Sequence, residues 1–201
     1  MNTMTDEQLM DRLKKGNINA VDELYNRYAK KMYAFYYNIM QSRNPEDLVH
    51  DVFVRVIENA HRFNPKKASF RTWLFRIARN RCIDLLRHDK KIKIISIEQE
   101  SGQNGDKKEL DLQKNKFLDE SQEVEKSFDK ASVIKAVRDC INELENEDEK
   151  QAIVLYYIAG KVYREIGGIF GKSISMVKKR IMSAQMKVKR CLERKGIDSI
   201  P

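Results

Sequence analysis

Cysteine, proline and long apolar runs are scarce in this chain of 201 residues. The three cysteines, Cys82, Cys140 and Cys191, are odd in number and form no CxxC pair. This spacing argues against a disulfide framework and against a zinc site, so we expect buried structural thiols. The longest stretch without a charged or strongly polar side chain, residues 152–160, is about half of the ~20 residues that a membrane-spanning helix needs. It predicts a buried helix instead.

Signatures of common catalytic sites are also absent from the sequence. It contains neither a GxxxxGKS/T phosphate-binding loop nor an HExxH metal-binding helix. Its three histidines, His50, His61 and His88, stand at no recognisable spacing from a nucleophilic cysteine. We therefore expect no enzymatic activity, no cofactor and no bound metal ion. The first fifteen residues interleave charged and apolar side chains, unlike a secretory signal, and predict a cytoplasmic protein.

Charge is unevenly placed along the chain. The formal net charge is +9, from 39 lysines and arginines against 30 aspartates and glutamates. Residues 1–90 carry +6, residues 91–130 carry −2 and residues 131–201 carry +5. Two basic blocks flank an acidic one, which makes a polyanion the leading class of partner. A membrane surface and simple solubility are alternative reasons for the basic charge.

A polar stretch divides the chain into two parts. Between residues 89 and 130 apolar side chains follow no regular spacing, and residues 98–109 read EQESGQNGDKKE. Such a composition is typical of a linker, because it offers too little apolar surface for a core. We predict an all-α protein with two small helical domains, residues 1–88 and 131–201, joined by a flexible linker over 89–130. A short strand over 92–97 is an alternative within that linker.

Three helices are predicted in the first domain from apolar residues at steps of three and four. The first is expected to begin at an Asn19 cap, and the third to span residues 69–86. The second is expected to begin at Asn44-Pro45, where a capping side chain precedes a proline at the first helical position. The inward faces expected are Val21, Leu24, Tyr25, Tyr28, Met32, Phe35, Tyr36 and Ile39; Leu48, Val49, Val52, Phe53, Val56 and Ile57; and Phe70, Trp73, Leu74, Ile77 and Leu85.

The second domain shows the outline of a helix-turn-helix after two earlier helices near 133–144 and 150–159. A short helix is expected over 163–170, then a turn at Gly171-Lys172, then a longer helix that Ser173 caps. Its outward residues would enter a major groove if DNA is the partner. Its inward residues are expected to be Ile174, Val177, Ile181, Ala184 and Val188.

Two segments combine features suited to nucleic acid. Residues 62–87 carry eight basic side chains and one acid, interleaved with aromatic residues that include Phe70 and Trp73. Cations bind phosphates and aromatic faces stack on unpaired bases, the combination that holds single strands. The alternative is that the aromatic residues are core and the arginines a solvated face. Residues 161–195 carry eleven basic side chains and two acids, although helical bundles with other functions imitate this outline.

Two stretches together resemble the sigma-70 family, specifically the extracytoplasmic-function (ECF) group of bacterial RNA polymerase sigma factors. In the first, NPEDLVHDVFVRVIENAHRF is followed by SFRTWLFRIARNRCIDLLR in the order and spacing of the family. The second, AGKVYREIGGIFGKSISMVKKRIMSAQMKVKRCL, is similar to the family pattern GxSYxEIAxxLGxSxGTVKSRxxRAxxxL. The resemblance covers most of residues 20–88 and 131–193.

The resemblance implies a non-enzymatic transcription initiation factor that directs RNA polymerase core to promoters. Its first domain would dock on the β′ clamp helices and capture the opened −10 strand, and its second would read −35 duplex and contact the β flap. Its other partner would be an anti-sigma factor. The family pattern places docking on Asp47, His50, Asp51, Val54 and Arg55; strand capture on Asn64, Lys66, Lys67, Ser69, Phe70 and Asn80; and duplex reading on Lys178, Lys179, Arg180, Met182 and Ser183.

The chain departs from the family pattern at several positions. Gly167-Gly168 replaces an alanine-containing pair, at a cost of about 1 kcal/mol of helix propensity for each glycine. The other departures are His50, Lys172, Met176 and Ser183. The promoter sequence preference therefore does not transfer.

Two other classes of protein fit part of the pattern. A stand-alone helix-turn-helix regulator would bind duplex DNA without polymerase, but it leaves the aromatic and basic residues 62–87 without a role. A resolvase-like enzyme would need a mixed α/β domain with a serine nucleophile, which the helical periodicity of residues 5–88 disfavours. Initiation by sigma-free polymerase core in the presence of this chain separates the three classes.

Overall fold

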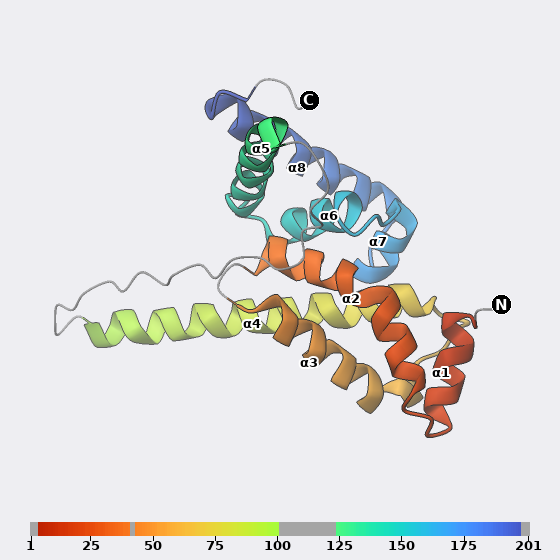
Figure 1. Cartoon of the computed structure of the whole chain (residues 1–201). Coiled ribbons are helices and arrows are strands. Elements are labelled where there is room, and N and C mark those ends of the chain that lie inside the picture. Colours follow the sequence, from red (N-terminus) through yellow and green to blue (C-terminus); the bar gives the residue numbers. More distant parts are fainter. Residues whose placement is uncertain (1–3, 41–42, 101–123, 198–201) are drawn as a thin grey trace.

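The computed structural model describes residues 4–40, 43–100 and 124–197; within them, the side chains of residues 90, 93–100 and 124–130 are not described. Every regular element in these ranges is a helix, which confirms the predicted all-α class. The helices form two lobes, α1 to α4 and α5 to α8 (Figure 1). No helix in the described ranges is long and apolar enough to cross a membrane.

The helix starts of the first lobe follow mostly from local capping chemistry. The Asn44 Oδ1 accepts a hydrogen bond from the Glu46 backbone N–H at 3.0 Å, and Pro45 occupies the first helical position, as predicted. Asn19 occupies the N-cap position of α2, as predicted, but its side chain makes no capping hydrogen bond. The elements of this lobe are α1 (Asp6–Lys14), α2 (Ala20–Ile39), α3 (Pro45–Glu58), the 3-10 helix η1 (Ala60–Arg62) and α4 (Phe70–Glu100).

The core of the first lobe lies where α2 crosses α3 and α4. The predicted stripe of α2 is buried, except that Tyr25 is partly exposed. On α3, Ile57 is 39% exposed, so its predicted inward position is wrong. Its exposure extends the apolar surface of Val54, which is 51% exposed.

Helix α4 is longer than the sequence predicted. It continues past residue 86 to Glu100, so the alternative of a strand over 92–97 is wrong. The alternation of lysine and isoleucine in that stretch imitates a strand, but no glycine or proline interrupts the helix between Phe70 and Glu100. Part of the predicted linker is therefore helical, and residues 101–123 of it lie outside the described residues.

The second lobe contains the predicted helix-turn-helix. Gly171 has a φ of 63°, the left-handed conformation that ends a helix, and the Ser173 side chain accepts a hydrogen bond from the Met176 N–H at 3.3 Å. Ile174 is 52% exposed and does not face inward as predicted. The elements are α5 (Val124–Asn142), α6 (Glu147–Tyr157), α7 (Tyr163–Phe170) and α8 (Ile174–Arg194).

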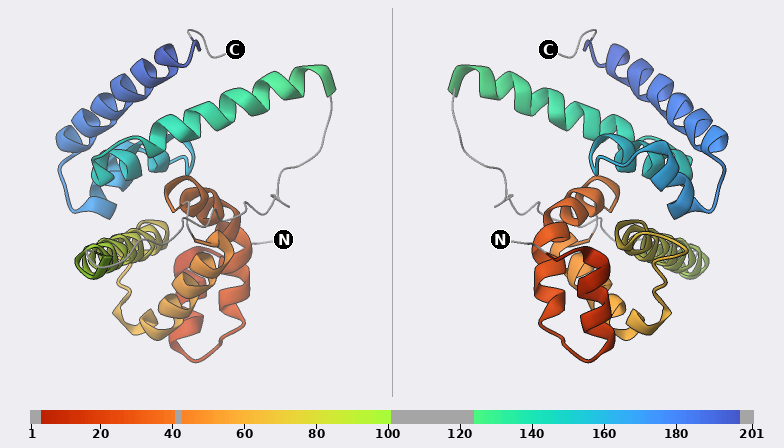
Figure 2. Two further views of the ribbon diagram at one scale, coloured as in Figure 1. Left: turned by 90° about the vertical axis from the view of Figure 1, so that its left-hand side faces the viewer. Right: turned by 90° about the vertical axis from the view of Figure 1, so that its right-hand side faces the viewer.

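The two lobes contact each other along two lines. Helix α7 packs against α4, and α5 and α6 pack against α2 (Figure 2). At the first contact, a Cβ added to Gly168 would lie 3.0 Å from the Thr72 methyl carbon. A glycine at this position therefore allows α7 to approach α4 closely.

The cysteines differ from the expectation in one respect. Cys82 is a buried free thiol, as predicted. Cys140 and Cys191, which the sequence assigned to the same class, form a disulfide between α5 and α8. Spacing along the chain missed this pair because the two residues are 51 positions apart and meet only when α8 packs against α5.

Candidate nucleic-acid interface

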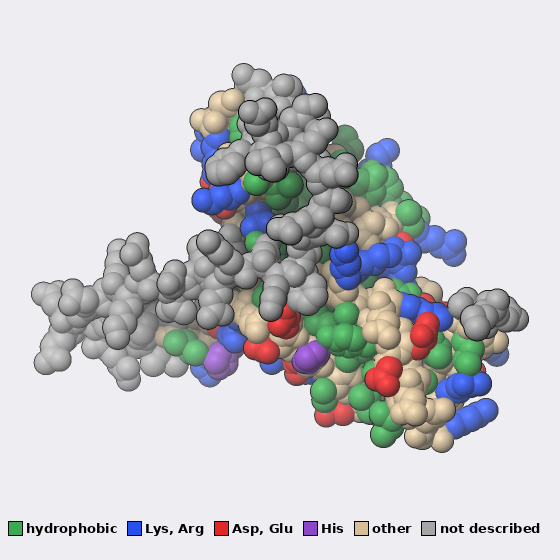
Figure 3. Space-filling view, viewed as in Figure 1, with side chains coloured by type: hydrophobic (Ala, Val, Ile, Leu, Met, Phe, Trp, Pro, Cys, Tyr) green, Lys and Arg blue, Asp and Glu red, His purple; other side chains and the backbone are tan. Residues whose placement is uncertain are grey.

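The outer face of α3 gathers the residues predicted for polymerase docking. Asp47, His50 and Val54 are exposed, and Asp51 and Arg55 are partly exposed. Their spacing of three and four residues places them on one side of the helix. Figure 3 shows acidic side chains and a histidine gathered over α3 on this face of the molecule. The structure thus brings all five predicted residues together.

Two contacts position this α3 face. The Asp51 carboxylate lies 2.5 Å from the Arg81 Nε of α4 and 3.4 Å from the Arg55 Nε. The Tyr25 hydroxyl lies 2.9 Å from the His50 Nε2. Asp51 is therefore partly used to hold α3 on α4, while Val54 is free to contact a partner. Arg81 and Ile57 belong to this surface and were not among the predicted residues. Apolar periodicity had assigned Ile57 to the inward face of the helix.

The loop between η1 and α4 was predicted to capture an opened strand. Asn64, Lys66, Lys67 and Ser69 are all exposed there. The Lys66 backbone N–H donates a hydrogen bond to the Asn64 Oδ1 at 2.9 Å, which shapes the loop. The two lysines therefore reach solvent from a turn of defined shape.

Phe70 and Asn80 lie in different surroundings from the loop. Phe70 has no exposed surface, and its ring packs against those of Tyr28, Phe63 and Trp73. This agrees with the alternative that Phe70 is a core residue, and a base cannot stack on it in this conformation. Asn80 is exposed on α4, about 15 Å along the helix axis from Phe70.

The basic side of α4 faces the second lobe. Arg71 donates a hydrogen bond to the Gly160 carbonyl oxygen at 3.1 Å, and its Nε lies 3.4 Å from a Glu165 oxygen. Arg76 donates to the Gly168 carbonyl oxygen at 2.5 Å. Figure 3 shows basic side chains gathered near the junction of the lobes. Part of the cationic surface predicted for nucleic acid is therefore occupied by the protein itself.

A charged cluster joins α4, α6, α7 and α8. The Asp148 carboxylate forms ion pairs with two arginines. Its oxygens lie 2.5 Å from the Arg79 Nη2 of α4 and 2.9 Å from the Arg180 Nη2 of α8. The same two guanidinium groups lie 4.1 and 5.8 Å from the centre of the Phe170 ring. Arg180 is thus drawn toward the junction of the lobes rather than into solvent.

The outer face of α8 carries the remaining predicted duplex-reading residues. Lys178, Lys179 and Met182 are exposed. Ser183 is partly buried and donates a hydrogen bond to the Glu149 Oε1 at 2.9 Å, so its hydroxyl is engaged inside the lobe. Two of the five predicted residues, Arg180 and Ser183, are therefore not free to contact a ligand. Two methionines that were not among the predicted site residues, Met176 and Met186, are 43% and 58% exposed on the same helix.

Lys161 is a buried cation at the junction that the predictions did not include. Its side chain has no exposed surface, its Nζ lies 4.1 Å from the Phe75 ring centre and 3.9 Å from a Glu165 oxygen, and it has no hydrogen-bond partner. Burial, with a smaller contribution from the charge of the nearby Arg71, lowers the pKa of Lys161 to about 7. Only the packing of the lobes reveals this environment.

Two family models match the chain in the order of its lobes. Sigma-70 region 2 matches residues 24–92, and Sigma-70, region 4 matches residues 134–187. The chain belongs to the sigma-70 family. Sigma factors of this family are non-enzymatic proteins that bind RNA polymerase and start transcription at specific promoters, and similarity to named relatives places this one in the ECF group.

Two curated relatives illustrate the similarity of this sigma factor to the ECF group. It is 28% identical to the ECF RNA polymerase sigma-E factor of Haemophilus influenzae over 187 residues, which cover 90% of this chain and 92% of that protein. It is 41% identical to the ECF RNA polymerase sigma factor RpoE of Cereibacter sphaeroides over 75 residues, only 35% of this chain and 40% of that one.

Two solved structures share the fold of this sigma factor. CnrH in complex with the cytosolic domain of CnrY superposes with a TM-score of 0.62 and 24% identity, over 94% of this chain and 97% of that chain. The sigma factor RpoE of Bartonella quintana, in complex with the anti-sigma factor NepR, gives a TM-score of 0.61 and 19% identity, over 86% and 96% of the two chains. At these identities the likeness concerns the fold.

Proposed function

We propose that this sigma factor reads promoters in two parts, with residues 1–88 and 131–201 acting as separate units on either side of the linker over 89–130. The first lobe captures the opened −10 strand, and the second lobe reads −35 duplex. The exposed cations Lys66 and Lys67 in the loop before α4, with Asn80, serve the first role. The exposed Lys178, Lys179 and Met182 of α8 serve the second, with Arg180 and Ser183 joining after their contacts inside the protein are released.

The observation that supports this division is the separation of two solvent-facing basic sites on different lobes. The Lys66–Lys67 turn presents two exposed cations, which suits the phosphates of an unpaired strand. Helix α8 is the second helix of a helix-turn-helix, the element that enters a major groove, and its free face is cationic. One ligand that contains both duplex and opened strand, a promoter, accounts for both sites.

The α3 face is the proposed docking surface for RNA polymerase core. It joins exposed carboxylates to the apolar Val54 and Ile57, a mixture of groups suited to a protein partner. We assign the β′ clamp helices to this face and the β flap to the second lobe, and we place the protein in the cytoplasm with the polymerase. An anti-sigma factor is the proposed regulator, because one structure of similar fold holds the anti-sigma factor NepR.

A transcription assay tests the proposal. We expect sigma-free core polymerase to initiate from a subset of a promoter library when this chain is added, and to show no specific initiation without it. Specific duplex binding by the chain together with no stimulation of core would contradict the proposal and favour a stand-alone helix-turn-helix regulator.

A substitution on α3 tests the docking surface separately. Val54→Glu places a charge in the exposed apolar part of the face, so we expect at least a ~10-fold loss of affinity for core, or about 1.4 kcal/mol. Asp51→Arg is less clean because it also breaks the Arg81 ion pair. Asn26→Glu, at an exposed position of α2, adds the same charge outside the face. Equal core binding by both variants in a pull-down, with unchanged circular dichroism, would remove Val54 from the interface.

A further inference from the structure

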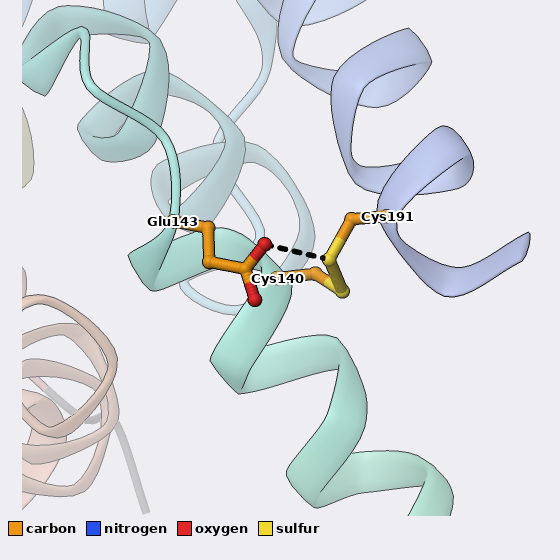
Figure 4. Close-up of side chains that lie close together, drawn as sticks. All are labelled: Cys140, Glu143 and Cys191. Atoms are coloured by element: carbon orange, nitrogen blue, oxygen red, sulfur yellow. Dashed lines mark hydrogen bonds between the residues drawn. A yellow bond between two sulfur atoms is a disulfide. The ribbon is translucent and has the colours of Figure 1, made fainter. Parts of the chain in front are cut away.

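A pair of sulfur atoms joins the first and last helices of the second lobe. Cys140 lies near the end of α5 and Cys191 near the end of α8, with Cα atoms 5.7 Å apart. The two residues are 1% and 3% exposed. Figure 4 shows the disulfide with Glu143 beside it. This pair lies at the opposite end of α8 from the proposed duplex-reading residues, so the proposed function does not use it.

We propose that Cys140 and Cys191 are a reversible redox pair that hydrogen peroxide oxidises, with Glu143 as the acceptor of the thiol proton. The proposal rests on the proposed function in one respect: it places the chain with RNA polymerase, in a compartment where thiols are normally kept reduced. A disulfide there forms under oxidation and is lost again on reduction, whereas in a secreted protein it would be permanent.

The position of Glu143 carries the argument for a thiol form. Its Oε2 lies 3.3 Å from the Cys191 Sγ, a distance suited to a hydrogen bond that sulfur donates. A disulfide sulfur has no proton, so this contact can be a hydrogen bond only when Cys191 is reduced. The carboxylate is also held by cations, with Lys195 Nζ at 3.0 Å and Arg194 Nη2 at 3.4 Å. These contacts hold the carboxylate beside the sulfur atom, where it can accept a thiol proton.

Access for a small oxidant comes from the surface beside the pair. Both cysteines line an open groove of about 720 Å³ between α5 and α8, with Glu143, Lys187 and Arg190 also on its walls. The groove reaches sulfur atoms that are otherwise covered by the helices. A molecule of the size of hydrogen peroxide fits this entry, whereas a protein oxidant would require the helices to separate.

The reaction balances with peroxide as the only oxidant. Cys191 transfers its proton to Glu143, and its thiolate attacks one peroxide oxygen, so the O–O bond breaks and a sulfenic acid forms. The leaving hydroxide takes the proton from Glu143 and becomes water. Cys140 sulfur then attacks the Cys191 sulfur, the S–O bond breaks, and the departing hydroxide takes the Cys140 proton as a second water. Two thiols lose two electrons in all, and the peroxide gains them.

A metal site is the competing use of the same side chains. One atom from each of Cys140, Glu143 and Cys191 lies within 4.8 Å of the other two. Zinc prefers four ligands, however, and within the described residues this cluster offers three, one of which already pairs with Lys195 and Arg194. The observations favour thiol oxidation over metal binding.

Cys82 supplies an internal control. It is a free thiol with no exposed surface, and burial raises its pKa to about 12, so little thiolate is present at neutral pH. We expect peroxide to leave Cys82 unchanged in the folded protein while it consumes the other two thiols.

The test begins with the fully reduced full-length chain. After a peroxide pulse, alkylation and mass spectrometry should show the loss of two thiols per chain, a Cys140–Cys191 linkage and an intact Cys82. Because the bond closes a loop of 51 residues, the thermal midpoint should rise by about 10 °C or more and return on addition of dithiothreitol. Cys140→Ser and Cys191→Ser should each abolish the rise. Retention of both thiols, or chains linked to each other instead, would overturn the proposal.

The role of Glu143 has its own readout. Glu143→Gln should slow disulfide formation by about 10-fold while it leaves the final rise in thermal midpoint unchanged, a pattern that a merely structural role would not give. Glu145→Gln, which removes a charge from the same groove, is the matched control. Equal rates in both variants would remove Glu143 from the reaction. Stoichiometric zinc binding that protects the reduced thiols would overturn the redox assignment. None of these measurements requires polymerase or DNA. A negative result would therefore contradict the redox proposal without contradicting the proposed function.

Discussion

At the scale of single residues, Lys161 makes the energetics of the lobe junction depend on pH. Its folded-state pKa is lowered to about 7 from the usual 10.5, with burial as the largest cause and Arg71 and Lys31 adding to it. The charges of Glu165 and Asp6 oppose this shift without cancelling it. Below pH 7 both the folded and the unfolded chain carry the proton, so the folded state bears the full cost of a buried charge. Between pH 7 and 10.5 the unfolded state binds more protons, so stability rises with pH.

We predict that Lys161→Met raises the free energy of unfolding at pH 7 and removes this pH dependence. The gain should be at most of the order of 5 kcal/mol, because the pKa is lowered from 10.5 to about 7 and each pKa unit corresponds to about 1.4 kcal/mol. Urea unfolding between pH 7 and 10 measures it. Lys189→Met, at a position whose side chain is 75% exposed, serves as control. If the difference in unfolding free energy between the wild-type protein and Lys161→Met stays constant over this pH range, Lys161 keeps its charge in the folded protein.

The glycine pair of α7 gives a second prediction at this scale. A Cβ on Gly167 would lie 2.9 Å from the Lys172 backbone carbonyl oxygen, which cannot move without distorting the turn. We expect Gly167→Ala to destabilise the second lobe by about 1–3 kcal/mol, even though alanine favours a helix by about 1 kcal/mol. Gly168→Ala should cost less, because its neighbour is a side-chain methyl group. Urea unfolding compares the two, and a more stable Gly167→Ala protein would contradict the steric argument.

At the scale of elements, α8 has two faces with different tasks. Its inner face holds the lobe together through Val177, Ile181 and Ala184, all nearly or fully buried. Its outer face leaves Lys178 and Lys179 in solvent. A helix built in this way can lose its outer charges without losing its fold, so its contribution to DNA binding can be measured alone.

We predict that replacing both Lys178 and Lys179 by alanine lowers affinity for −35 duplex and flattens its salt dependence. Each phosphate contact contributes about 0.9 to the logarithmic slope, so the slope should fall by about 2. Fluorescence anisotropy at several salt concentrations provides the measurement. Replacing Lys189 and Arg190 by alanine removes the same charge from exposed positions further along α8. An equal change in slope for both double variants would mean that only net charge matters.

At the scale of the whole molecule, the contact between the lobes hides part of the basic side of α4. Arg76 and Arg79 are tied to Gly168 and Asp148 of the other lobe. A ligand that binds the same arginines must first break these contacts, and the free energy needed to break them lowers its affinity. A partner that binds both lobes at separate positions supplies the energy to part them.

We predict that Asp148→Asn loosens the lobes, because Asp148 pairs with one arginine from each. Affinity for a single-stranded oligonucleotide should rise a few-fold, and small-angle X-ray scattering should show a larger radius of gyration. Glu145→Gln removes one charge from an exposed position of the same lobe and should change neither. Unchanged scattering and unchanged strand binding in Asp148→Asn would show that this pair does not hold the lobes together.

The sequence by itself determined most of the helical elements and the helix-turn-helix, but it did not predict α1 or the part of α4 beyond residue 86. Apolar periodicity, the Asn44-Pro45 start, the Gly171 turn and the Ser173 cap act within a few residues of each other, so local chemistry suffices to specify them. Periodicity within one helix also places the five residues of the α3 face on its outer side, and their docking role comes from the family resemblance. The family resemblance carries the same local patterns in a recognisable order.

Only the tertiary structure decided which distant side chains meet. Cys140 pairs with Cys191, Arg79 pairs with Asp148, and Phe70 enters the core rather than the loop surface. The partners in the first two contacts are 51 and 69 positions apart in the chain. Their proximity depends on how helices and lobes pack, and hydrophobic periodicity specifies which face of a helix is buried but not which other helix covers it.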